Sequence, residues 1–170
     1  AFWGMTAIDK VFLRSLSTYE ELGVYSVATS FAAAAIVFQS VFSIVWAPIV
    51  YKWAAEGVNT EKIDRVTEYV LLAVVALFCV AGVFSWVITY VLPPQYESVQ
   101  FILLSCMAYP LFYTLSETTV VGLGIARKSS YAMLAALIGC AVSLVGNYLL
   151  IPLYGAAGAG VSTAVAFWVF

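Results

Sequence analysis

Five polar side chains interrupt stretches of the sequence that are otherwise apolar, and they are the first candidates for chemistry. They are Asp9, Lys10, Arg14, Gln39 and Glu117. Lys10 and Arg14 are four residues apart and therefore share one face of a helix. Ionisable groups inside a membrane commonly mark the path of a substrate or an ion. Asp9, Lys10, Arg14 and Gln39 are therefore candidates for a polar substrate pathway between helices.

Lys10, Arg14 and Gln39 each allow more than one role. The two basic side chains line a cavity between helices, extend to the membrane interface, or pair with Asp9; if their helix ends early, they meet water. Gln39 either contacts a sugar or makes a hydrogen bond to a neighbouring helix. The residue types alone leave these alternatives open.

Glu117 is the candidate for ion coupling. It stands ten residues before Arg127, which is about 15 Å along a helix at 1.5 Å per residue. A carboxylate at that depth is costly unless it is paired, hydrated or protonated. One prediction is therefore that Glu117 couples transport to H⁺ or Na⁺. The other is that Glu117 pairs structurally with a helix in a missing half of the protein, outside this sequence.

Composition excludes several classes of protein. Charged residues make up 9% of the chain and hydrophobic residues 64%, whereas soluble domains average about 25% charged residues. The seven Lys and Arg residues are scattered, so the sequence predicts no nucleic-acid partner. There is no histidine, and the three cysteines lie in apolar runs that favour packing. We expect neither a bound metal nor a cofactor.

The elements that position the candidates are long uncharged runs. Residues 22–51 include no charged residue, and a bilayer core of about 30 Å needs only about 20 apolar residues. The sequence predicts an all-α polytopic transmembrane helix bundle, in one domain over residues 1–170. The expected complete spans are 22–48, 69–92, 98–126 and 131–151, and the expected partial spans are 1–16 and 158–170.

The loops between these spans predict an orientation. Residues 52–68 include three basic residues and residues 127–128 two, whereas 15–21, 92–97 and 151–157 include none. Basic residues favour the cytoplasmic side of a membrane. The span at 22–48 is therefore expected to run from outside to inside, and the spans after it to alternate.

Several motifs, in their order and spacing, resemble a known family. They are DKVFL at 9–13, LGVYSVA at 22–28, WAP at 46–48, YK at 51–52 and NYLLIPLYGAAGAG at 147–160. This set resembles the C-terminal half of bacterial polysaccharide flippases, the O-antigen and capsule translocases. Their superfamily also includes the MATE drug exporters and the lipid II flippases.

The resemblance implies half of a two-bundle transporter in the bacterial inner membrane, with an N-terminal half missing. The chain opens without Met and stops inside an apolar run, so we expect a fragment of a longer protein. The implied function is to flip an undecaprenyl-diphosphate-linked oligosaccharide from the cytoplasmic to the periplasmic leaflet by alternating access. The family usually has an acidic residue followed by Arg at the first motif, but here Lys10 follows Asp9. Lysine lacks the bidentate fork of arginine.

Two other functions compete with this expectation. One is a drug or cation antiporter of the same superfamily. The other is a polytopic membrane enzyme of glycan assembly, which would need a cluster of Asp, Glu, His or Arg in a large outward loop. The predicted outward loops are seven residues long or shorter and hold no such cluster. We therefore expect a transporter rather than an enzyme.

Overall fold

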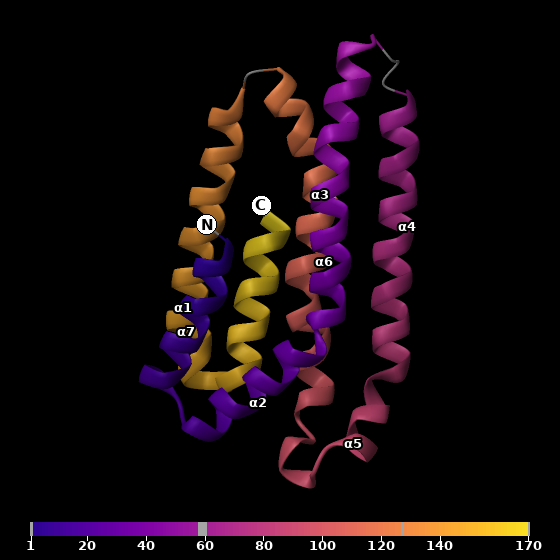
Figure 1. Cartoon of the computed structure of the whole chain (residues 1–170). Helices are drawn as coiled ribbons and strands as arrows, with labels where there is room; N and C mark the ends of the chain where they lie inside the picture. The colour runs from indigo at the N-terminus through magenta and orange to yellow at the C-terminus, as the bar shows by residue number, and fades with distance from the viewer. Residues whose placement is uncertain (1, 58–60, 127, 170) are drawn as a thin grey trace.

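Every regular element in the described part of the chain is a helix (Figure 1). The computed structural model describes residues 2–57, 61–126 and 128–169. The helices are α1 (Phe2–Leu16), α2 (Tyr19–Phe31), α3 (Ala33–Ala55), α4 (Glu61–Phe84), η1 (Ser85–Val87), α5 (Ile88–Val91), η2 (Pro94–Tyr96), α6 (Val99–Ile125) and α7 (Ser129–Val169). The all-α prediction is confirmed for these residues. Arg127 and the outermost residues of the two predicted partial spans lie outside them.

Four helical segments are long and apolar enough to cross a membrane, which is compatible with a multi-pass membrane protein. They are Ala33–Ala55, Glu61–Val91, Val99–Ile125 and Ser129–Val169. Large apolar side chains also cover the outside of the bundle: Tyr90 is 81% exposed, Phe101 77% and Leu153 74%. Contiguous apolar surface of this kind marks a face that meets lipid or another protein.

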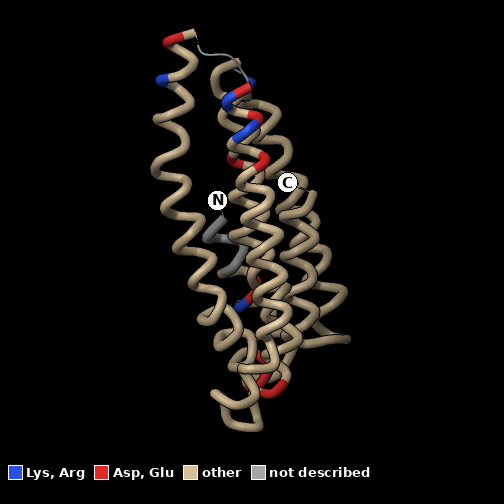
Figure 2. The backbone as a smooth tube through the Cα atoms, turned by 90° about the vertical axis from the view of Figure 1, so that its right-hand side faces the viewer, with Lys and Arg blue, Asp and Glu red and all other residues tan. Residues whose placement is uncertain are grey.

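The long helices run up and down along one axis, with α6 in the middle (Figure 1). α6 packs against α2, α3, α4 and α7, while α1 packs against α2 and α7. The last residues of α3 and α6 and the first residues of α4 and α7 lie at one end of the bundle. The turn between α1 and α2, the short helix α5 and a bend in α7 lie at the other. Most Lys and Arg residues gather at the first end (Figure 2).

The predicted span at 22–48 is divided in the structure. α2 lies across the lower end of the bundle and meets α3 at Ala32 (Figure 1). The hydroxyls of Thr29 and Ser30 both donate to the carbonyl of Ser26, each at 2.9 Å. Such bonds to a preceding turn compete with the helix ladder and often bend it. The bend was not predicted, because the sequence there has neither proline nor glycine.

Two predicted helix boundaries also shift. α3 continues past Pro48 to Ala55, because an internal proline removes one backbone hydrogen bond but need not end a helix that neighbouring helices support. The predicted spans 131–151 and 158–170 are joined as the two arms of α7, which meet at Gly155. Gly155 has φ 55°, a left-handed conformation that glycine adopts without the strain of a side chain.

Labelling from outside the cell tests the predicted orientation. In a variant of the full-length protein without native cysteines, we expect a cysteine replacing Gln95 to react with an impermeant thiol reagent on intact cells. Cysteines replacing Glu56 or Ser129 should react only after the cells are opened. Glu56 follows the last residue of α3 and Ser129 is the first residue of α7, and these helix ends lie where most basic residues gather. The opposite pattern would invert the orientation.

Candidate functional site

A fully buried carboxylate joins three helices. Asp9 on α1 has no exposed surface. The Tyr25 hydroxyl on α2 donates to its Oδ2 at 2.8 Å, and the Thr163 hydroxyl on α7 donates to the same oxygen at 2.6 Å. The Asn147 amide nitrogen, on the other arm of α7, donates to Oδ1 at 2.6 Å. Asp9 therefore connects α1 to α2 and to both arms of α7.

The Asp9 carboxylate has neutral partners only. Within the described ranges it forms no ion pair, since the two ion pairs there are Lys52–Glu56 and Arg65–Glu61. A buried charge without an opposite charge is costly. Two further oxygens near the site, Oδ1 of Asn147 and Oγ of Ser143, are buried without a hydrogen-bond partner. The arrangement thus has one negative charge and two spare oxygens, which suits uptake of a proton or a small cation.

The described residues hold no cluster of three or more His, Cys, Asp or Glu side chains that would ligate a metal ion. A cation at Asp9 would depend on neutral oxygens for most of its ligands. Hard monovalent and divalent cations accept such carbonyl and hydroxyl ligands, whereas zinc prefers nitrogen and sulfur.

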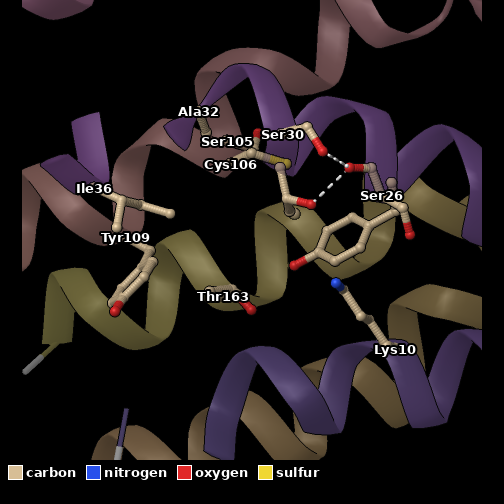
Figure 3. Close-up of a pocket in the computed structure, with 12 residues that line it drawn as sticks. Lys10, Ser26, Ser30, Ala32, Ile36, Ser105, Cys106, Tyr109 and Thr163 are labelled. Atoms are coloured by element: carbon tan, nitrogen blue, oxygen red, sulfur yellow. Dashed lines mark hydrogen bonds between the residues drawn. The ribbon is translucent and has the colours of Figure 1, made fainter. Parts of the chain in front are cut away.

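A cavity of about 420 Å³, with many polar side chains in its wall, lies directly beside this cluster, between α1, α2, α6 and α7 (Figure 3). Tyr25 and Thr163 belong to both the cavity wall and the Asp9 cluster. Lys10 points towards it from α1. Its other polar wall residues are Ser26, Thr29, Ser30, Ser105 and Tyr109. The cavity therefore offers one ammonium group and many hydroxyls, which can bind an anion and a polyhydroxylated molecule.

The bend between α2 and α3 helps to shape this cavity. Thr29 and Ser30, whose hydroxyls bond back to Ser26, are wall residues, and so are Ala32 at the bend and Ile36 just beyond it. A straight helix would place the start of α3 elsewhere relative to α2. The hydroxyls that bend the chain are thus the same groups that make the wall polar.

The structure divides the predicted pathway residues into separate places. Asp9 and Lys10 come together at the cavity. Arg14, one turn further along α1, is exposed, as Lys10 is, but unlike Lys10 it does not line the cavity, and it makes no ion pair with a described residue. Gln39 lies with Glu117 instead: its amide donates to Ser43 at 3.0 Å, and Ser43 in turn donates to the Glu117 carboxylate. Gln39 therefore makes its hydrogen bond within α3, and Ser43 makes the bond from α3 to α6.

Sequence reasoning missed the three residues that hold Asp9. Asn147 was the one with a visible signal, because an amide in the middle of an uncharged apolar run needs a partner. A tyrosine near the end of an apolar run, such as Tyr25, is typical of an interfacial anchor, yet Tyr25 is only 2% exposed. Thr163 gave no signal, because threonine is common in membrane helices and often bonds to its own backbone.

Glu21 was also missed, and it holds the bend of α7. The backbone N–H of Ala156 donates to the Glu21 carboxylate at 2.7 Å. Ala156 begins the second arm of α7, directly after Gly155. A carboxylate at this position satisfies a free N–H of the first turn and favours the helix dipole. The angle between the two arms is thus supported by Glu21 at the bend and by Asp9 between them.

No protein-family model, curated protein or solved structure matches this chain.

Proposed function

We propose that this chain forms part of a bacterial inner-membrane transporter that flips an undecaprenyl-diphosphate-linked oligosaccharide from the cytoplasmic to the periplasmic leaflet. The observation that carries the proposal is the cavity lined by Lys10 and hydroxyl groups beside the buried Asp9. The motifs described above support the same family, and the four long apolar helices suit a membrane location.

The cavity has the chemistry that such a substrate requires. A diphosphate needs a positive charge along its route, because an anion in hydrocarbon without a counter-charge is prohibitively costly. Lys10 supplies that charge at the cavity wall. Sugars need donors and acceptors, which the serine, threonine and tyrosine hydroxyls supply. The volume falls in the range of small-molecule sites, about 300–1,000 Å³, so one or two sugar units at a time can enter it.

The buried carboxylate suits the coupling of transport to H⁺ or Na⁺. Alternating access requires an element with two arrangements whose balance a ligand changes. Asp9 bonds to α2 and to both arms of α7, so a proton or cation at Asp9 would alter contacts among all three. Asp9 replaces Glu117 as our candidate for this role, because Asp9 is fully buried and Glu117 is only half-buried.

A comparison of Lys10 and Arg14 in the full-length protein tests the proposal. We expect Lys10→Ala to lower surface glycan per membrane-inserted protein by about tenfold or more, which corresponds to about 1.4 kcal/mol of lost binding. Lys10→Arg should restore part of it, since the charge remains. Arg14→Ala is the matched control on the same helix and should retain most activity, because Arg14 lies outside the cavity.

If Arg14→Ala lowered surface glycan more than Lys10→Ala, the cavity would not be part of the substrate pathway. Normal glycan in Lys10→Ala, with loss in Arg14→Ala, would place the route along the exposed side of α1 instead. Normal glycan in both variants would leave the flippase proposal without a cationic contact in this part of the protein.

A further inference from the structure

A second cavity, of about 370 Å³, lies between α3, α6 and α7 and shares no wall residue with the first. Glu117 is its charged group, and Tyr51 and Tyr113 are its aromatic residues. Much of the remaining wall is aliphatic: Val120, Val121, Leu123, Ala132 and Ala136. This cavity combines one carboxylate with a wall that is largely apolar.

The Glu117 carboxylate is fixed in place by neutral groups. The Ser43 hydroxyl donates to its Oε2, and the Tyr113 hydroxyl, one helical turn away, also interacts with it. The Trp46 indole N–H donates to the backbone carbonyl of Glu117 at 3.2 Å, which ties α3 to α6 at this point. Within the described ranges no Lys or Arg pairs with Glu117. The side chain is therefore positioned for a positive charge that the described chain does not supply.

The shape and composition of the cavity indicate the kind of cation. A single carboxylate is a poor site for a metal ion, and the cavity is much larger than a bare ion. Aromatic faces attract organic cations through their quadrupoles, and the aliphatic wall favours an apolar body. The Tyr51 hydroxyl lies close against α6, 3.0 Å from where a Cβ on Gly124 would stand. A small residue at Gly124 thus leaves room for the Tyr51 ring at the cavity.

We infer that this second cavity binds an amphipathic organic cation, with Glu117 as the counter-charge and Tyr51 and Tyr113 beside the charged centre. The inference does not depend on the proposed glycan transport, because the two cavities have separate walls and separate charged groups. A cation bound here would bridge α3, α6 and α7.

Binding of tetraphenylphosphonium tests the inference. The experiment is equilibrium dialysis with the full-length protein in detergent micelles, against protein-free micelles as the blank. We expect saturable binding of tetraphenylphosphonium, and none of the similarly shaped anion tetraphenylborate. Glu117→Gln should weaken tetraphenylphosphonium binding by about tenfold or more, since a desolvated charge pair is lost. Glu68→Gln, an exposed acid on α4, is the matched control and should change binding less than about twofold.

A second pair of variants keeps the test informative if Glu117→Gln fails to fold. Ala136→Phe fills the cavity and leaves the carboxylate intact, so it should also abolish tetraphenylphosphonium binding. Ala141→Phe places the same ring on an exposed position of the same helix and should not. Equal binding of the two probe ions, or unchanged binding in both Glu117→Gln and Ala136→Phe, would overturn the inference.

Discussion

Replacing Asp9 with asparagine is expected to abolish surface glycan while the full-length protein stays folded in the membrane. The substitution keeps the volume of the side chain and removes only its charge. The Asn147 amide can rotate to accept a hydrogen bond from the new amide, because Oδ1 of Asn147 has no hydrogen-bond partner among the described residues. Surface glycan per membrane-inserted protein is the measurement. If charge at this position drives the coupling step, surface glycan should fall to about the level of a strain without the transporter.

Asp9→Ala separates folding from function in the same assay. Removing the carboxylate leaves the donors of Tyr25, Asn147 and Thr163 without their acceptor in a buried site. Each such group costs about 1–3 kcal/mol, so Asp9→Ala should also lower the amount of folded protein. Asp64→Asn, at an exposed position on α4, is the conservative control. It should change neither the surface glycan nor the amount of folded protein. Full glycan in Asp9→Asn would show that Asp9 serves the structure alone.

Gly158→Ala is expected to cause the largest loss of stability among the glycine substitutions. A Cβ at Gly158 would lie 2.6 Å from the carbonyl carbon of Leu150 and 3.0 Å from the nitrogen of Ile151. Both are backbone atoms of the other arm of α7, so no side-chain rotation relieves the contact. The arms would have to move apart, which disturbs the bonds from Asp9 to both of them. Overpacking of this kind costs about 1–3 kcal/mol or more.

This loss of stability is measured as a lower midpoint of thermal unfolding. The purified full-length protein is heated in detergent, and the fraction still folded at each temperature is measured by size-exclusion chromatography. Gly122→Ala on α6 is the matched control, because a Cβ there meets nothing within 4 Å. Alanine is also the better helix former by about 1 kcal/mol, so Gly122→Ala should be neutral or slightly stabilising. Equal midpoints for the two variants would mean that the arms of α7 are not packed as closely as described.

Local sequence patterns were sufficient to predict the class of fold. Long uncharged runs such as 22–51 predict membrane-spanning segments, and their length favours helices. Proline pairs and charged segments also indicated where helices end, as at Pro93 and Pro94 after α5. These features are readable because they depend on neighbours within a few residues. The bend at Ala32 was not readable, because it depends on how hydroxyls share one carbonyl in the folded helix.

The grouping of the polar residues was decided only by the tertiary structure. Asp9 meets Asn147 and Thr163 across 138 and 154 positions of the chain, and Glu117 meets Ser43 across 74. A sequence marks Asp9 and Glu117 as costly in a membrane, but not which helix face each one turns to, since a rotation of one helix changes every partner. By itself the sequence determined that a few charged residues lie within long apolar runs. Helix packing determined that Asp9 joins α1, α2 and α7, whereas Ser43 and Glu117 join α3 to α6.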